Sequence, residues 1–236
     1  MGDRPLVLST RACNRDVGAW TDHQGAGAPG GGPRSARASR GGWLTATADP
    51  RDALLRRHLT TRDGRNLLIR PAVSDDAEAL VALRDAVASE GRWLAALPGE
   101  RSPLEERISL AQLISGGGLC LVAEVDGEVC AQLAVVRPYG SYQAHLGELS
   151  VAVASGARGR GVGTALLMVA VDWARAVGIA KLWLAVFPDN ERAIAIYRNA
   201  GFVEEGRQRD QVRVAGQSRD LLLMGLRLGT REPSSD

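Results

Sequence analysis

The residues best suited to chemistry lie in a glycine-rich segment, residues 158–164, that follows an apolar stretch ending at Val153. The segment reads Arg-Gly-Arg-Gly-Val-Gly-Thr, and apolar residues at helical spacing begin within it. The first turn of a helix presents unpaired N–H groups and the positive end of the helix dipole. Glycines let a ligand approach that backbone closely, so the segment predicts a phosphate site at the start of a helix.

Three classes of phosphate-binding loop compete for this segment, and their spacing separates them. A Walker loop requires a Gly-Lys pair five residues after its first glycine, but counting from Gly156 a valine replaces the lysine. A dinucleotide fingerprint, Gly-x-Gly-x-x-Gly, fails because Thr164 stands where the third glycine belongs. The remaining pattern, Arg-x-x-Gly-x-Gly, is met by Arg158, Gly161 and Gly163.

A second motif follows a predicted buried strand over residues 181–187. It reads Asn190-Glu-Arg-Ala-Ile-Ala-Ile-Tyr197 and is followed by Gly201-Phe202. The two motifs in this order resemble the GNAT family of acyl-CoA-dependent N-acetyltransferases, over about residues 62–228. The resemblance implies an α/β (α+β) fold with a mixed, mostly antiparallel central sheet, helices on both faces and splayed middle strands. It also implies direct transfer of an acetyl group from acetyl-CoA to a primary amine in a ternary complex.

The resemblance assigns cofactor-binding roles to individual residues. The pyrophosphate of acetyl-CoA is expected on the backbone of Arg158, Gly159, Arg160, Gly161, Val162, Gly163 and Thr164. The two arginine side chains are available for charge-assisted contacts. The backbone of Val151, Ala152 and Val153 is expected to pair with the pantetheine amides like an added strand. Asn190 is expected to contact the pantetheine arm. The structural alternatives are an ordinary strand-to-helix turn and, for Asn190, a helix cap.

Two residues are candidates for proton transfer. Tyr197 stands at the family's tyrosine position, where it protonates the leaving thiolate, and a place in the apolar core is its alternative. Glu148 precedes the glycine-rich segment on a predicted strand, whose alternation places it on one face with Ser150 and Ala152. It is the candidate base for the ammonium substrate, with a water chain to His145 as the alternative.

The acceptor site is specified less well by the sequence. We expect the first two helices, around Trp93, and the final hairpin, near residues 214–218, to hold the amine substrate. Arg92 and Arg101 are candidates for contact with a substrate carboxylate, with solvated surface positions as the alternative. Cys120 and Cys130 fall in a predicted hairpin away from the glycine-rich segment, so transfer through a cysteine is not expected.

Local patterns predict the elements that position these residues. A first strand covers residues 67–71, Ser74 caps a following helix, and a second helix covers residues 103–114. An Asp126-Gly127 turn joins strands at 119–125 and 128–136 into a hairpin. The remaining predicted elements are a strand at 148–153, a helix at 161–176, a strand at 181–187, a helix at 191–200 and strands near 202–214 and 219–228.

The first sixty residues differ from the rest in composition. Residues 25–42 include seven glycines, and such a segment buries too little apolar surface to fold. We therefore expect a poorly ordered extension at 1–60, in which residues 52–59 form a short helix leading into the domain. A single acetyltransferase domain is expected at 61–230 and a flexible tail at 231–236.

Bulk composition argues against several classes of partner. With 29 basic and 27 acidic residues, the net charge of +2 gives no strong field to attract nucleic acid. The longest apolar run is far shorter than the ~20 residues of a membrane-spanning helix. Three cysteines lack the spacing of a zinc site or a disulfide framework, so no metal is expected.

These observations define the expected partners. We expect a cytoplasmic enzyme with acetyl-CoA as acyl donor and a small-molecule or peptide amine as acceptor, without nucleic-acid or membrane partners. The exposed final strand offers an edge for a homodimer. A non-catalytic sensor or scaffold that binds acyl-CoA is the alternative function.

Overall fold

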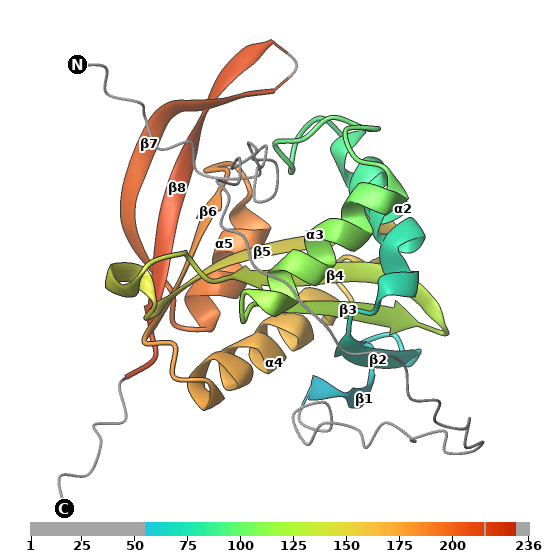
Figure 1. The fold of residues 1–236 in the computed structure, drawn as a ribbon. Helices are drawn as coiled ribbons and strands as arrows, with labels where there is room; N and C mark the ends of the chain where they lie inside the picture. The colour runs from blue at the N-terminus through green and yellow to red at the C-terminus, as the bar shows by residue number, and fades with distance from the viewer. Residues whose placement is uncertain (1–54, 215, 230–236) are drawn as a thin grey trace, which may run out of the picture.

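The computed structural model describes residues 55–214 and 216–229 (Figure 1). Its strands are β1 Arg57–Thr60, β2 Asn66–Pro71, β3 Leu119–Val125, β4 Glu128–Val136, β5 Leu146–Val153, β6 Lys181–Val186, β7 Val203–Val214 and β8 Gln217–Arg227. Its α-helices are α2 Ala77–Ala88, α3 Pro103–Ser115, α4 Val162–Ala176 and α5 Glu191–Asn199. Short 3-10 turns occur at η1 Ser74–Asp76, η2 Ser141–Gln143 and η3 Ser155–Ala157.

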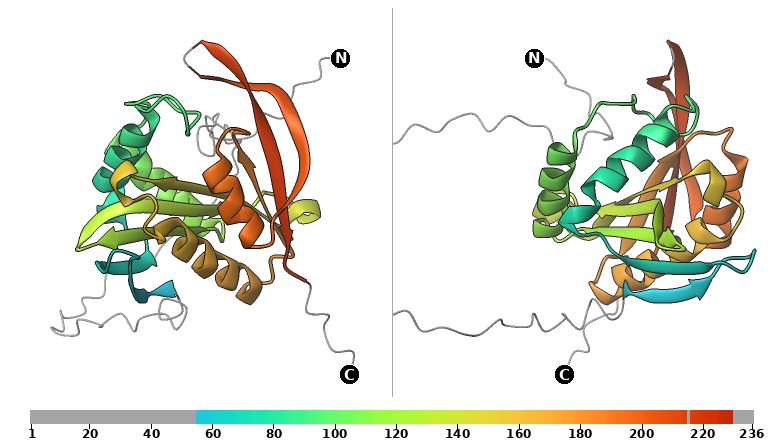
Figure 2. Two further views of the ribbon diagram at one scale, coloured as in Figure 1. Left: turned by 180° about the vertical axis from the view of Figure 1, so that it is seen from behind. Right: turned by 90° about the vertical axis from the view of Figure 1, so that its right-hand side faces the viewer.

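The strands form one sheet in the order β1-β2-β3-β4-β5-β6-β8-β7. Only β5 and β6 are parallel, and every other neighbouring pair is antiparallel. Helices α2 and α3 cover one face of the sheet, whereas α4 and α5 cover the other (Figure 2). The expected mixed, mostly antiparallel sheet with helices on both faces is therefore confirmed. None of the helices within residues 55–214 and 216–229 is long and apolar enough to cross a membrane.

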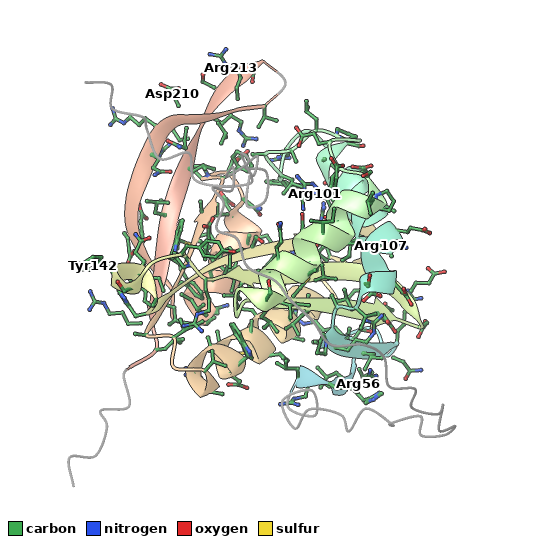
Figure 3. The ribbon with its side chains drawn as sticks, viewed as in Figure 1. Arg56, Arg101, Arg107, Tyr142, Asp210 and Arg213 are labelled. Carbon is green, nitrogen blue, oxygen red and sulfur yellow. The ribbon has the colours of Figure 1, made fainter. Side chains whose placement is uncertain are left out.

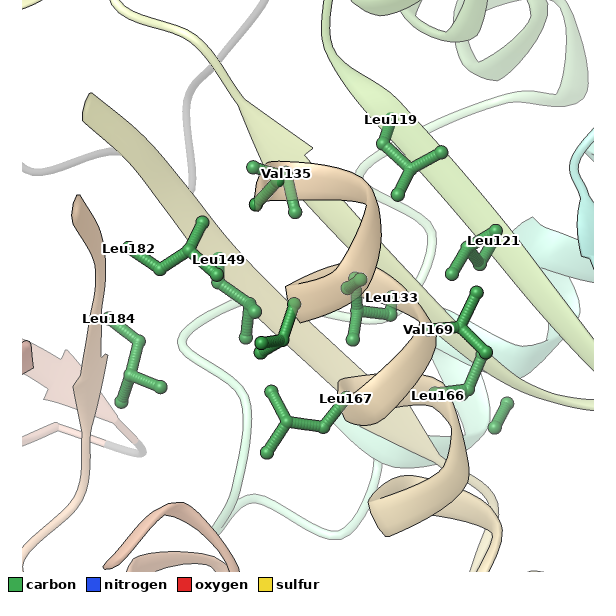
Figure 4. Close-up of a cluster of buried hydrophobic side chains, with 14 of the residues drawn as sticks. Leu119, Leu121, Leu133, Val135, Leu149, Leu166, Leu167, Val169, Leu182 and Leu184 are labelled. Atoms are coloured by element: carbon green, nitrogen blue, oxygen red, sulfur yellow. The ribbon is translucent and has the colours of Figure 1, made fainter. Parts of the chain in front are cut away.

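The main core lies between the sheet and α4 (Figure 4). The apolar positions of α4 recur at helical spacing, so one side of the helix is apolar and faces the alternate residues of the central strands. The buried side chains that meet there include Leu166, Leu167, Leu121, Leu133, Leu149, Leu182 and Leu184. A smaller core under α2 and α3 contains Leu80, Leu110, Cys120 and Val122.

The two parallel strands separate soon after they begin. β5 and β6 pair over three positions, from Leu146 opposite Lys181 to Glu148 opposite Trp183. Beyond that point β5 stays paired with β4 through Val153, and β6 stays paired with β8 through Val186. We call this divergence, between residues 149–153 and 184–186, the β5–β6 fork. It confirms the expected splayed middle strands.

The hairpin of β3 and β4 is confirmed with the expected bounds. Asp126 has a φ of 52° and Gly127 a φ of 89°, which are the positive values that a type I′ turn requires. Ser102 caps α3, because its Oγ accepts a hydrogen bond from the Glu105 N–H at 3.3 Å. The Glu105 carboxylate accepts one in return from the Ser102 N–H at 2.7 Å.

Two local expectations are wrong. The helix expected at residues 52–59 is wrong at its end: residues 57–59 belong to β1, Arg57–Thr60, which pairs with β2 because the edge of β2 supplies the backbone partners that this polar segment lacks by itself. Leu55 is buried too, so the packed region begins before residue 61. Ser74 does not cap the following helix: it is the first residue of η1, which leads into α2, and the Asp76 carboxylate accepts from the Val73 N–H at 2.7 Å. Residues 1–54, Ala215 and residues 230–236 lie outside the described residues.

Candidate active site

The glycine-rich segment joins the end of β5 to the first turn of α4, and we call residues 158–164 the glycine loop. Gly159 and Gly161 have φ values of 82° and 91°, in the left-handed region that only glycine adopts without strain. The backbone hydrogen bonds of α4 begin with the one that the Ala165 N–H donates to the Gly161 carbonyl at 3.0 Å. The N–H groups of Val162, Gly163 and Thr164 are therefore the free donors of the helix.

The two arginine side chains of the glycine loop are held by other parts of the protein. The Arg158 Nε donates to the Val153 carbonyl at 2.9 Å, and its two terminal nitrogens each lie 2.6 Å from a carboxylate oxygen of Glu90. Arg160 Nη1 lies 3.1 Å from an oxygen of Asp63. Both side chains, expected to be available to a ligand, therefore anchor the loop to the segment after α2 and to the β1–β2 turn.

Two arginines that the sequence analysis did not select flank the same loop. A Cβ atom on Gly159 would lie 2.5 Å from Nη2 of Arg192, in the first turn of α5. A Cβ atom on Gly161 would lie 3.7 Å from Cγ of Arg62, in the β1–β2 turn. Arg192 falls within the second motif, two residues after Asn190, and that position was the available signal. Arg62 has no comparable signal, because only the tertiary fold brings it to the loop.

The second motif forms the loop after β6 and the helix α5. The Asn190 side-chain oxygen accepts a hydrogen bond from the Ala193 N–H at 3.2 Å. Asn190 therefore caps α5, which is the structural role expected as the alternative to cofactor contact. Tyr197 is partly buried against the main core, and its ring centroid lies 5.8 Å from that of Phe202. Burial raises the pKa of Tyr197 to about 12, so its phenol keeps its proton at neutral pH.

Glu148 lies at the last paired position before the β5–β6 fork. Its neighbours across the sheet are Val136 on β4 and Trp183 on β6. Burial raises the pKa of Glu148 to about 7, because the carboxylate loses hydration there. A carboxyl group with this pKa takes up and releases a proton near neutral pH, as a general base requires. His145 lies three residues earlier and is exposed.

The segment between α2 and α3, residues 89–102, contacts the strands on the other side of the fork, and we call it the acceptor loop. Arg219 of β8 pairs with Asp189, and its Nη1 donates to the Arg92 carbonyl at 3.0 Å. Its guanidinium carbon also lies 4.2 Å from the centre of the Phe187 ring. Arg92 lies over the Trp93 ring at 4.2 Å and within 3.8 Å of Asp189.

These contacts bring together two of the regions expected to hold the acceptor, the Trp93 segment and the strand β8 of the final hairpin. Arg92 and Arg101, the latter labelled in Figure 3, both have carboxylate partners. Arg92 lies near Asp189, and Arg101 lies 2.9 Å from Glu106 in the first turn of α3. Asp210 and Arg213 lie at the far end of the β7–β8 hairpin (Figure 3). Arg219 is opposite Val212 of β7, next to Arg213, so the part of the hairpin that meets the acceptor loop is near its tip.

The two cysteines within the described residues, Cys120 and Cys130, offer no reactive thiolate near the fork. Cys120 is buried on β3, and burial raises its pKa to about 12. Burial also raises the pKa of Cys130 on β4. Both thiols therefore stay protonated at neutral pH and are poor nucleophiles.

Comparison with known proteins matches residues 86–202 to the model of the acetyltransferase (GNAT) family. Streptothricin acetyltransferase of Streptomyces lavendulae is 39% identical over 77 residues, which are 33% of this chain and 40% of that protein. The chain spans about 40 to 55% of the length of the curated relatives it matches.

Solved structures match over a larger share of the chain. Ribosomal-protein-alanine N-acetyltransferase from Brucella melitensis is 30% identical, with a TM-score of 0.63 over 68% of this chain and 99% of that one. Phosphinothricin acetyltransferase from Sinorhizobium meliloti, in complex with acetyl-CoA, shares the fold at 23% identity, with a TM-score of 0.65 over 69% of this chain and 89% of that one. The resemblance carried by the two sequence motifs is thus confirmed, and the chain belongs to the acetyltransferase (GNAT) family.

Proposed function

We propose that this protein is an N-acetyltransferase that moves an acetyl group from acetyl-CoA to a primary amine by direct transfer in a ternary complex. The observation that carries the proposal is the β5–β6 fork, which opens at a partly buried glutamate and leads to the glycine loop. Relatives named for the acetylation of streptothricin and of ribosomal-protein alanine support an amine acceptor. A relative of the same fold was crystallised with acetyl-CoA, which supports the donor.

The residues around the fork fit an acyl-CoA. The strand edge formed by Val151, Ala152 and Val153 has β4 on one side and lacks a paired strand on the other, so it can pair with pantetheine amides. The glycine loop then offers the pyrophosphate the N–H groups of Val162, Gly163 and Thr164. Gly159 and Gly161 keep Cβ atoms away from the approaching phosphates. The side-chain amide of Asn190 both caps α5 and faces the pantetheine arm in this arrangement.

Two side chains of this chain then move protons. Bound acetyl-CoA supplies an activated acetyl thioester. Glu148, whose pKa is raised to about 7, accepts a proton from the ammonium group of the acceptor, which frees the nitrogen lone pair. Tyr197 keeps its proton because its pKa is raised to about 12, and it donates that proton to the sulfur that leaves as CoA thiol. Because a free thiol titrates near ~8.5, this second transfer contributes less than the first.

The acceptor is a small molecule or a peptide amine held between the acceptor loop and β8. A sensor or scaffold that binds acyl-CoA without turnover is the second candidate, and it needs the same glycine loop. The partly buried Glu148, with its raised pKa, and the protonated Tyr197 favour the enzyme, because a sensor has no use for either group. Cys120 and Cys130 are free thiols, which suits the cytoplasm. The largely exposed edge strand β7 suits a homodimer.

Calorimetric titration of acetyl-CoA tests the donor assignment. We expect wild type to bind and Gly161→Trp to lose binding, because the indole fills the space over the glycine loop. Gly178→Trp, at the other end of α4 and also at a positive φ, is the matched control and keeps binding. A folded wild type that fails to bind acetyl-CoA contradicts the proposal. Release of CoA thiol across a panel of amines then separates an enzyme, which releases thiol, from a sensor, which does not.

A further inference from the structure

The charges around the glycine loop fall into two classes. Arg158 and Arg160 belong to the loop itself, and each is paired with a carboxylate, Glu90 and Asp63 respectively. Arg62 and Arg192 come from outside the loop, and neither pairs with a carboxylate among the described residues. Four guanidinium groups and two carboxylates therefore leave a net charge of about +2 beside the free N–H groups of α4.

The positions of these two arginines are set by the backbone around them. Nη2 of Arg192 lies 2.5 Å from the site of a Cβ on Gly159, so its guanidinium covers the space left by the missing side chain. Cγ and Nε of Arg62 lie 3.7 and 3.8 Å from the corresponding site on Gly161. The Arg62 N–H donates to the Arg160 carbonyl at 3.0 Å, which ties the β1–β2 turn to the loop. The two side chains thus flank the loop at its two left-handed glycines.

We propose that Arg62 and Arg192, and not the loop's own Arg158 and Arg160, supply the cationic contacts to the phosphates of CoA. The proposal rests on the proposed function and names the side chains that select its acyl donor. CoA carries a pyrophosphate and a ribose phosphate, and the latter alone has about −1.5 to −2 charges near neutral pH. A guanidinium forms two parallel hydrogen bonds with such a group. Both arginines are exposed, and within residues 55–214 and 216–229 neither holds a carboxylate that a phosphate must first displace.

Arg158 and Arg160 have a different task in this arrangement. The bidentate pair of Arg158 with Glu90, together with its bond to the Val153 carbonyl, fixes the loop against β5 and the acceptor loop. Arg160 fixes the other side of the loop to the β1–β2 turn that carries Arg62. The paired arginines therefore position the backbone donors, and the unpaired arginines bind charge. An acyl group on pantetheine alone receives no help from Arg62 or Arg192, so the chain selects CoA thioesters.

Calorimetry with acetyl-CoA and with 3′-dephospho-acetyl-CoA tests this division. Arg62→Ala and Arg192→Ala are each expected to weaken acetyl-CoA binding about tenfold, as the loss of a charge-assisted contact does. Both variants should also flatten the dependence of affinity on salt. Arg192→Lys keeps the charge and recovers part of the loss. Arg198→Ala is the matched control, because it removes an arginine of the same helix that pairs with Glu204 at 4.0 Å, and it binds as wild type does.

The two donors assign each contact to a phosphate. If a side chain binds the ribose phosphate, its substitution weakens the binding of acetyl-CoA but not that of 3′-dephospho-acetyl-CoA. If it binds the pyrophosphate, its substitution weakens the binding of both compounds equally. Either pattern supports the proposal. If wild type binds acetyl-CoA and both Arg62→Ala and Arg192→Ala bind it with the same affinity, the assignment of these two arginines is overturned. The proposed acetyltransferase function is not affected by that result. A wild type that binds neither donor overturns the proposed function, and this inference with it.

Discussion

The two sides of the β5–β6 fork are built by different means. On the donor side, the proposed site is the backbone of residues 151–164, which are contiguous and include glycines where φ is positive. On the acceptor side, side chains join segments that are distant in sequence, as when Arg219 contacts Asp189, 30 residues away, and the Arg92 carbonyl, 127 residues away. A backbone site tolerates most side-chain changes except at its glycines, whereas a side-chain site depends on each ion pair. Substitutions on the donor side should therefore change the affinity for acetyl-CoA, whereas those on the acceptor side should change kcat or the KM for the amine.

The largest effect is expected from Glu148→Gln, which removes the candidate base on the acceptor face. We expect kcat to fall at least about 100-fold, because a positioned general base contributes on that order. The affinity for acetyl-CoA, measured by calorimetry, should stay within about twofold of wild type. Glu128→Gln, an exposed glutamate on β4, is the matched control with full activity. A loss of acetyl-CoA affinity as large as the loss of kcat would break the separation between the two sides.

Tyr197→Phe tests the proton donor and should have a smaller effect. We expect kcat to fall about tenfold, since the leaving thiolate is stable enough to depart with little help near neutral pH. The ring keeps its contact with Phe202, so the melting temperature should change little. Tyr142→Phe is the control, because Tyr142 is 95% exposed. If Tyr197→Phe and Tyr142→Phe have the same kcat, Tyr197 has a purely structural role.

Arg219→Ala sharpens the comparison from the acceptor side. It removes the contacts with Asp189, the Arg92 carbonyl and the Phe187 ring. We expect the KM for the best amine found in the thiol-release screen to rise about fivefold, as loss of a partly exposed ion pair does. The affinity for acetyl-CoA stays constant. Arg207→Ala on β7, which breaks an exposed pair with Asp220, serves as control. A shift confined to acetyl-CoA affinity would place Arg219 on the donor side.

The smallest effect is on stability and follows from the burial of Glu148. The Glu148 carboxyl group has a pKa of about 7 in the folded protein, whereas a glutamate in the unfolded chain has a pKa near ~4.3. Between these values the folded state binds more protons, so the free energy of unfolding falls as pH rises, and the contribution is lost above about pH 7. Glu148→Gln lacks this dependence. Its melting temperature relative to wild type should therefore rise from pH 5 to pH 8, and a constant difference would contradict the raised pKa.

Sequence reasoning predicted several elements of the fold well because their signals are local. The Asp126-Gly127 turn, the apolar stripe of α4 and the glycines of the loop each depend on residues a few positions apart. The same reasoning missed β1, whose residues Arg57–Thr60 are mostly exposed and lack an alternating pattern. That strand exists because β2 offers it an edge, which is information outside its own residues.

The contacts between the glycine loop and distant segments show the same limit more strongly. The partner of Arg158 is Glu90, 68 residues away, and no spacing rule connects them. The expectation that Arg158 and Arg160 await a ligand treated the loop as isolated, whereas the folded chain supplies carboxylates to both. Arg62 reaches the glycine loop only because β1 and β2 form a hairpin beside it. Long-range side-chain pairs of this kind require the tertiary structure.

At the β5–β6 fork, residues 149–153 of β5 have β4 as their one strand neighbour among the described residues. The backbone amides of residues 149–153 that point toward β6 lack a strand partner, so they should exchange with solvent deuterium faster than those that point toward β4. An acyl-CoA that pairs with this edge completes the sheet and slows that exchange. At a ligand concentration of about 100 times Kd, binding adds about 2.7 kcal/mol to the free energy of unfolding. The acyl donor then takes the place of a strand in the sheet. The melting temperature measured in the presence of acyl donor therefore reports how much of it is bound.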